Sequence, residues 1–255
     1  MIKSKKLSKF ENIEHAFFNR LGGISTGIYK SLNCGPGSFD KKKNILKNLQ
    51  IVQKKIKSKS KSKKIILLKQ IHSNKFYYID KNLKLINKKF NGDALITDRR
   101  NTPIGVLTAD CVPILMFDKQ KKLIAAIHAG WKGAYKDIIK KVVKFMIKKG
   151  CTPKNITAAI GPCISVKNYE IKQDFIKKFI KKDKNNKKFF KKDNNKNFFN
   201  LPMYIYSQLN SLDIKKIDVI NKDTFSNKNK FFSARRSINQ NENDYGRNIS
   251  IIMIN

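Results

Sequence analysis

The stretch from residue 108 to residue 133, TADCVPILMFDKQKKLIAAIHAGWKG, contains two apolar runs separated by a short polar segment. Residues 112–118 and 123–129 have the length and composition of buried strands, because their apolar side chains follow one another instead of alternating with polar ones. Such strands need cover on both faces. Cys111 and His128 stand at the edges of these runs. The stretch therefore predicts two core strands whose ends carry residues able to form a site.

The rest of the chain continues this pattern of short apolar runs bounded by polar residues, glycine or proline, which predict strands. These runs occupy residues 65–69, 75–80, 93–97, 104–108, 155–160, 216–220, 230–234 and 248–254. Amphipathic stretches at residues 134–150 and 201–212 predict helices, and the first ends at Gly150, a favoured helix stop. Strands that need cover and helices that supply it indicate an α/β fold, in one domain over residues 1–255.

Lysine- and asparagine-rich segments interrupt this pattern at residues 54–64, 82–89 and 181–197. Like charges repel one another and offer little apolar area to bury. We therefore expect the segments at 54–64 and 181–197 to be surface insertions, either solvated loops or helix extensions. Neither has to be a domain linker, since the apolar runs on both sides are short and similar in composition.

The chain carries a formal net charge of +38, from 56 lysines and arginines against 18 acidic residues. Such a charge first suggests a nucleic-acid or anionic-membrane partner. Lysine supplies most of it and is scattered along the whole chain, whereas nucleic-acid surfaces more often use arginine with interleaved aromatic residues. We expect no specific nucleic-acid partner, although salt-sensitive binding to polyanions should occur.

Membrane and export signals are not expected in this sequence. No stretch approaches the roughly 18 apolar residues of a membrane span, and no apolar segment follows the basic start as in a secretory signal. The four cysteines show no tight framework spacing, which favours reduced thiols. We expect a cytoplasmic protein without a membrane partner, and the sequence leaves open whether it is a monomer or a homodimer.

His72, like Cys111 and His128, lies where an apolar run gives way to a loop. Strand ends are where α/β proteins place their sites, because loops converge there. Two imidazoles and a thiolate that converged would bind zinc and leave a fourth position for water or substrate, as in catalytic zinc sites. Their spacing matches no compact zinc-binding pattern. From the residues alone, a buried cysteine and a hydrogen-bonded histidine are an equally good interpretation.

Two arginine-containing stretches are candidate anion-binding sites. FFNRLGGISTG places Arg20 before paired glycines, whose backbone N–H groups could face an oxyanion. FFSARR supplies Arg235 and Arg236, whose guanidinium groups suit bidentate contact with phosphate. We take these three arginines as candidate substrate-binding residues, although arginine at a strand end is often a solvated surface residue. Asp110 is a candidate proton carrier, but a regular strand would point it away from Cys111.

Taken together, these motifs resemble the YfiH/laccase-domain family, the purine nucleoside phosphorylases once described as multicopper polyphenol oxidases. The resemblance rests on HAFFNRLGGIS, KQIHS, GDALITD, TADCVPILMFD, AAIHAGWKG, AIGPCI and FFSARR, which run the length of the chain. TADC followed by HAGWKG is highly specific. The resemblance implies a YfiH-like α/β/β/α sandwich, a single domain of packed mixed β-sheets with outer helices.

The resemblance also implies that His72, Cys111 and His128 are the zinc ligands and the catalytic residues. It implies phosphorolysis of adenosine, inosine and S-methyl-5'-thioadenosine, with deamination of adenosine as a further activity. Purine nucleosides and phosphate would then be the partners. The chain departs from the family's usual pattern at Leu49, Asn200 and Asp223. These departures lie outside the ligand set and concern substrate preference more than the metal.

Three other functions are compatible with the same residues. One His-Cys-His copper centre with an axial methionine would suit a copper-binding oxidase, but three histidines are too few for a multicopper oxidase. A Cys-His hydrolase or deamidase would use Cys111 as nucleophile and His128 as base. A non-enzymatic protein would bind polyanions through its lysines with a steep salt dependence and no turnover.

Overall fold

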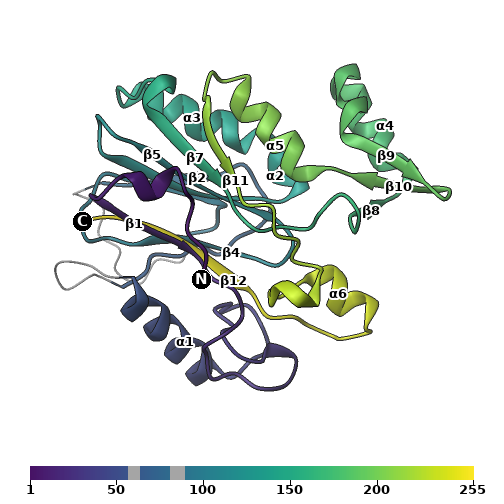
Figure 1. Cartoon of the computed structure of the whole chain (residues 1–255), viewed down its shortest axis with the longest axis horizontal. Coiled ribbons are helices and arrows are strands. Elements are labelled where there is room, and N and C mark those ends of the chain that lie inside the picture. The colour runs from purple at the N-terminus through teal and green to yellow at the C-terminus, as the bar shows by residue number, and fades with distance from the viewer. Residues whose placement is uncertain (57–63, 81–89) are drawn as a thin grey trace.

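Two β-sheets packed face to face form the centre of the computed structural model, which describes residues 1–56, 64–80 and 90–255 (Figure 1). The larger sheet has the strand order β11-β7-β5-β6-β3-β2, and the smaller sheet has the order β1-β12-β4. The larger sheet consists of β2 (Phe76–Ile79), β3 (Ala94–Thr97), β5 (Val112–Asp118), β6 (Leu123–Ala129), β7 (Ile156–Ile160) and β11 (Lys216–Val219). The smaller sheet consists of β1 (Ile13–Phe17), β4 (Ile104–Thr108) and β12 (Asn248–Ile254).

Strands β5 and β6 are apolar along their whole length because both of their faces are covered. On β5, Ile114 and Met116 contribute to the core beneath the helices, whereas Leu115 and Phe117 contribute to the core between the sheets. All seven residues of each strand are buried. The two strands pair antiparallel, with Val112 opposite Ala129. The prediction of two core strands from this stretch is confirmed.

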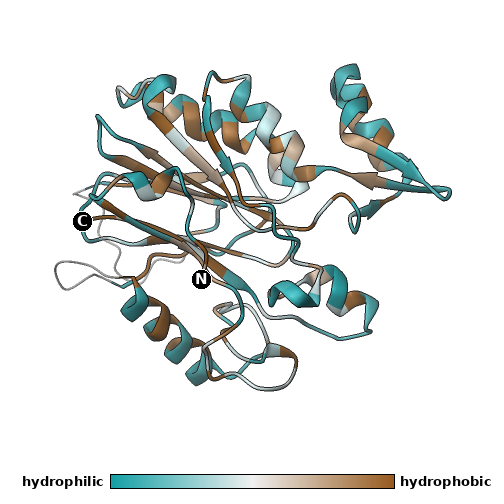
Figure 2. Ribbon diagram, viewed as in Figure 1, coloured by the Kyte–Doolittle hydropathy of each residue, from teal (hydrophilic) through white to brown (hydrophobic). Residues whose placement is uncertain are grey.

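Helices cover the outer faces of both sheets, which gives the order helix, sheet, sheet, helix (Figures 1 and 2). On the larger sheet, α3 (Ile138–Lys148) and α5 (Leu201–Asn210) pack their apolar faces onto the strands. On the smaller sheet, α1 (Lys42–Lys55) packs against the outer face through Val52. The expected sandwich of mixed sheets with outer helices is confirmed.

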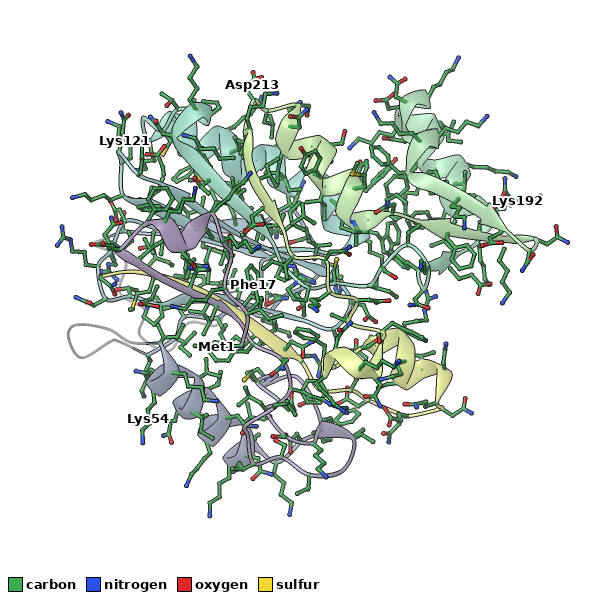
Figure 3. All side chains as sticks on the ribbon, viewed as in Figure 1. Met1, Phe17, Lys54, Lys121, Lys192 and Asp213 are labelled. Atoms are coloured by element: carbon green, nitrogen blue, oxygen red, sulfur yellow. The ribbon has the colours of Figure 1, made fainter. Side chains whose placement is uncertain are left out.

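Short helical segments complete the fold. They are η1 (Leu7–Lys9), η2 (Gly27–Tyr29), α2 (Trp131–Tyr135), η3 (Pro153–Asn155), η5 (Asn227–Asn229) and α6 (Ala234–Asn239). The single helix predicted for residues 134–150 is interrupted, because Asp137 adopts a left-handed conformation with φ 62° between α2 and α3. Phe17 lies in the core between the sheets, whereas Lys54 and Lys121 lie at the periphery (Figure 3).

The expectation of a loop or helix extension at residues 181–197 is confirmed for the helical first half, up to Phe189, and is wrong for the second half, which forms two strands. This segment belongs to a lobe that projects to one side of the sandwich (Figure 1). The lobe contains β8 (Glu170–Ile171), α4 (Gln173–Lys182), η4 (Lys184–Phe189), β9 (Phe190–Asp193) and β10 (Lys196–Phe199). Its lysines are solvated, but Phe199 packs between Phe179 and Phe190, with ring centroids 4.9 and 5.1 Å away. The phenylalanines among the lysines supply the apolar face that a pure charge run would lack.

Two segments that were predicted to be strands are described by the structure but do not form strands. Residues 65–69 form only isolated bridges through Ile66 and Lys69. At residues 230–234 the chain turns into α6, because the Ser233 side chain accepts a hydrogen bond from the backbone N–H of Arg236 and caps the helix. Of the expected insertion at 54–64, residues 57–63 lie outside the described residues, as does the segment at 82–89.

The four cysteines are free, as expected for reduced thiols. Among the residues that the structure describes, none of the helices combines the length and apolar composition of a membrane span.

His15 on β1 is a buried neutral imidazole in the described structure. Its Nε2 accepts a hydrogen bond of 2.9 Å from the backbone N–H of Ser4, and only 2% of the residue is exposed. Burial and the charge of Lys3 together lower the pKa of His15 from 6.5 to about 4, against a smaller opposing effect of Glu14. The unfolded chain therefore binds a proton at His15 between pH 6.5 and 4 that the folded protein does not.

We predict that His15→Gln makes the protein less sensitive to acid. In the wild type, the His15 contribution to the free energy of unfolding is fully present above pH 6.5 and is lost as the pH falls toward 4, by up to about 3 kcal/mol. Urea unfolding of both proteins between pH 7 and 4 measures this effect. Equal losses of stability in the two proteins would contradict it.

Candidate metal centre

His128 lies near the end of β6, where the sheet fixes both its backbone and its ring. Its backbone N–H donates to the carbonyl of Asp93, 2.7 Å away, at the start of the neighbouring strand β3. Its Nδ1 lies 2.8 Å from Oδ1 of Asp93. The residue is 3% exposed. When Nδ1 donates its proton to this carboxylate, Nε2 is left as the free nitrogen.

Cys111 reaches His128 because of the antiparallel register of β5 and β6. Val112 pairs with Ala129, so Cys111 lies one residue beyond the ladder, beside Gly130. Asp110, which precedes it, adopts a left-handed conformation with φ 83°. The loop before β5 therefore turns sharply, and Cys111 is half-buried at the edge of the sheet.

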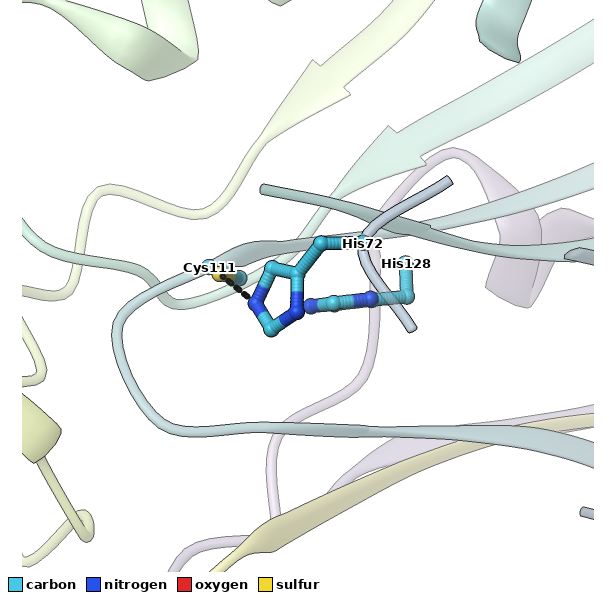
Figure 4. Close-up of side chains that lie close together, drawn as sticks. All are labelled: His72, Cys111 and His128. Atoms are coloured by element: carbon cyan, nitrogen blue, oxygen red, sulfur yellow. Dashed lines mark hydrogen bonds between the residues drawn. The ribbon is translucent and has the colours of Figure 1, made fainter. Parts of the chain in front are cut away.

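His72 comes from a loop far away in the sequence and completes the cluster (Figure 4). Its Nε2 lies 3.8 Å from Sγ of Cys111. Its ring packs edge-on against that of His128, with centroids 4.8 Å apart. Its backbone is left-handed, with φ 54°, and its N–H donates to Oδ1 of Asp93. His72 is the exposed member of the cluster.

The geometry of the three side chains fits a metal ion. One nitrogen or sulfur atom from each of His72, Cys111 and His128 lies within 4.8 Å of the others. In a tetrahedral zinc site, zinc–ligand distances of about 2.1 and 2.3 Å place a nitrogen and a sulfur ligand about 3.6 Å apart, close to the separation of His72 and Cys111. Two nitrogens and a thiolate suit both zinc and copper.

Gly130 leaves the room that the cluster needs. A Cβ atom at this position would lie 2.8 Å from Sγ of Cys111 and 2.9 Å from Cδ2 of His72. The backbone φ of Gly130 is −71°, which any residue can adopt. Glycine is therefore required by the approach of the two ligand side chains and not by the turn.

Cys111 and His128 each favour the charged form of the other. Burial raises the pKa of the Cys111 thiol, but the charge of His128 and its hydrogen bond outweigh burial and lower the pKa to about 7. Burial lowers the pKa of His128, but the Cys111 thiolate and Asp93 outweigh it and raise the pKa to about 9. A metal ion would release the His128 proton and take the place of its charge.

The three predicted arginines occupy different environments. Arg20 is half-buried and donates to Oδ1 of Asn227, 3.0 Å away. Arg235 donates to the carbonyl of Glu170 and lies over the ring of Tyr169, 5.6 Å from its centroid.

Arg236 donates to three backbone carbonyls, those of Thr224, Phe225 and Phe231, at 2.9, 2.8 and 2.6 Å. This guanidinium therefore joins loops of the protein, a role that the sequence motif did not indicate.

Asp110 is held by its neighbours and is nearly buried. Its Oδ1 accepts from the hydroxyl of Thr224 and its Oδ2 accepts from the backbone N–H of Arg235, both at 2.7 Å. Burial raises its pKa. These contacts connect the first turn of α6, which carries Arg235, to the residue next to Cys111.

Sequence reasoning did not identify Asp93 or Gly130 as parts of this site. A signal for Asp93 was present, because an acidic residue directly before a fully apolar run must find hydrogen-bond partners when it is buried. Burial raises the pKa of Asp93, but hydrogen bonds from His128 and Ser73 outweigh it and hold the pKa below its usual range.

The family model described as multi-copper polyphenol oxidoreductase laccase matches residues 14–255. A purine nucleoside phosphorylase of Rickettsia conorii is 35% identical over 237 residues, which are 89% of this chain and 96% of the relative. An adenosine deaminase of an unknown prokaryotic organism is 36% identical over 123 residues, 46% of this chain and 47% of that protein. The crystal structure of hypothetical protein YfiH from Bacillus licheniformis has a TM-score of 0.86 and 25% identity, covering 95% of this chain and 93% of that one.

We predict that Gly130→Ala weakens metal binding by about tenfold or more without unfolding the protein, because the new Cβ atom displaces the ligand side chains. Chelator competition with zinc measures the affinity, and thermal unfolding of the metal-free protein checks the fold. Gly37→Ala is the control, since a Cβ atom there meets nothing within 4 Å. Equal zinc affinity in the two variants would contradict the prediction.

Proposed function

The chain belongs to the family described as multi-copper polyphenol oxidoreductase laccase, and from that premise we propose that it is a zinc-dependent purine nucleoside phosphorylase. The proposed substrates are adenosine, inosine and S-methyl-5'-thioadenosine, with deamination of adenosine as a second activity. The convergence of His72, Cys111 and His128 carries the proposal. The relatives named as a purine nucleoside phosphorylase and an adenosine deaminase support the two reactions.

In phosphorolysis, an oxygen of phosphate forms a bond to C1′ of the ribose while the bond from C1′ to the purine nitrogen breaks. The purine takes up a proton and leaves, and ribose 1-phosphate is the other product. Zinc, when bound, supplies a Lewis acid that polarises an oxygen of phosphate or water. His72, Cys111 and His128 would hold it, and Cys111 would do so as a thiolate, the form that its lowered pKa favours.

Arg20 and Arg235 would bind phosphate and stabilise its charge in the transition state. Asp110 would act on Arg235 through the backbone hydrogen bond between them and so keep the start of α6 near Cys111. Because its carboxylate already accepts from Thr224 and Arg235, we assign Asp110 positioning and not proton transfer. We place the enzyme in the cytoplasm, with free nucleosides and phosphate as partners.

A Cys-His hydrolase or deamidase is the second candidate. The observation that favours it is the close approach of the Cys111 sulfur and a ring nitrogen of His128, which is the arrangement of an activated cysteine nucleophile. In such an enzyme, a covalent adduct forms on Cys111 and activity survives removal of metal. In the zinc enzyme, Cys111→Ser loses metal and activity together.

A multicopper oxidase would need more imidazole ligands than this chain has. Of the three histidines, His15 is bonded to the backbone of Ser4 and does not belong to the cluster of ligand atoms. One copper ion on the same three ligands is the form of an oxidase that the chain could support. Metal analysis separates this form from the zinc enzyme.

We predict that the zinc-loaded protein releases adenine from adenosine and hypoxanthine from inosine only when phosphate is present, and that His128→Ala reduces both rates by at least about 100-fold, because the ligand is lost. Chromatography of the free bases measures phosphorolysis. Conversion of adenosine to inosine without phosphate measures deamination in the same samples.

Stoichiometric copper with intense visible absorption would favour the oxidase. Absence of any base release, with binding to heparin and to nucleic acid that weakens steeply with salt, would favour a polyanion-binding protein.

We predict that Arg20→Met raises the KM for phosphate about tenfold and leaves the KM for inosine nearly unchanged, because it removes the charge proposed to bind phosphate and not the nucleoside. Lys228→Met is the control, since it removes one exposed positive charge next to Asn227. An equal rise of the phosphate KM in Lys228→Met would contradict a specific role for Arg20.

Arg236→Met, in contrast, should lower the free energy of unfolding by about 1–3 kcal/mol, because three carbonyls lose their donor.

A further inference from the structure

We propose that Asp93 is the positioning residue of this centre, one carboxylate that sets both the ring of His128 and the backbone of His72. The inference rests on the metal site of the proposed function. Asp93 lies directly before β3, between the two histidines in space, and is fully buried. It contacts both metal-binding segments but offers no atom to the cluster itself.

Five hydrogen-bond donors converge on the two oxygens of Asp93. Oδ1 accepts from Nδ1 of His128 at 2.8 Å and from the backbone N–H groups of Ile71 and His72 at 3.2 and 3.0 Å. Oδ2 accepts from the backbone N–H and the hydroxyl of Ser73 at 2.6 and 2.7 Å. An ionised carboxylate, which only accepts, satisfies all five.

The contact with His128 selects the nitrogen that can bind a metal. A carboxylate that accepts the Nδ1 proton keeps this proton in place and leaves the lone pair on Nε2, on the side of Cys111. The same contact fixes the rotation of the ring and raises the basicity of the ligand nitrogen. Without it, the ring could turn or place its proton on the nitrogen that must be free.

The contact with residues 71–73 holds His72 in a costly conformation. A non-glycine residue in the left-handed region is strained and persists where its surroundings compensate. Three successive backbone N–H groups that point at one buried carboxylate supply this compensation. The position of the exposed His72 side chain therefore depends on a buried residue 21 positions later in the sequence.

Asparagine has the shape of aspartate but cannot replace it here. In either orientation of the amide, its NH₂ group would face backbone N–H donors that cannot turn away. Asp93→Asn would therefore change the hydrogen bonds of both histidine segments while the volume of the buried side chain stays constant.

We expect Asp93→Asn to weaken zinc binding by about 10- to 100-fold, measured by chelator competition, and to change the absorption spectrum of the cobalt-substituted protein. Asp118→Asn is the matched control. Asp118 is also fully buried and accepts from two backbone N–H groups, those of Gln120 and Lys121, but it lies at the far end of β5 from Cys111 and outside the cluster. Its variant should bind zinc as tightly as the wild type.

Nitrogen-15 NMR of the zinc-loaded wild type tests the inference even if Asp93→Asn fails to fold. We expect a proton on Nδ1 of His128 and none on Nε2. The opposite tautomer, or equal zinc affinity in the wild type and Asp93→Asn, would overturn the role of Asp93 and leave the proposed function standing. A wild type that binds no zinc would overturn the proposed function and, with it, this inference.

Discussion

The antiparallel pairing of β5 and β6 is the constraint on which the site depends. Because Val112 pairs with Ala129, Cys111 and Gly130 meet at one end of the ladder, and His128 lies one step inside it. Side chains alternate between the two faces of a strand, so a shift of one residue would turn His128 to the other face. Both faces of these strands are buried in packed cores, which makes such a shift very unfavourable.

The position of His72, the third side chain of the cluster, is fixed in a different way. His72 lies in a loop with no regular strand pairing, and its position follows from hydrogen bonds to a carboxylate at the start of β3. The sheet thus positions His128 and Cys111 directly and His72 through Asp93. Two side chains held by the sheet and an exposed third, His72, leave one side of the candidate centre accessible.

Local sequence patterns predicted the parts of the fold that are decided locally. The runs at 112–118 and 123–129 became strands because their apolar side chains need cover on both faces. Residues 230–234 contain β-favouring phenylalanines, yet the hydroxyl of Ser233 caps a helix there. The lysine content of residues 181–197 did not predict the β-hairpin that forms there. Phe190 and Phe199 stabilise this hairpin by packing against Phe179 of α4, and the charge of the segment gives no information about that contact.

The sequence by itself determined the class of fold, the three metal-binding candidates and the family, because apolar patterning and the motifs TADC and HAGWKG are local properties. Only the tertiary structure decided that the three side chains meet, that Gly130 clears the space between them and that Arg236 is bonded to backbone carbonyls. The role of Asp93 also belongs to the tertiary structure. Hydrogen bonds between residues 21 and 35 positions apart depend on how strands and loops pack, which no local pattern encodes.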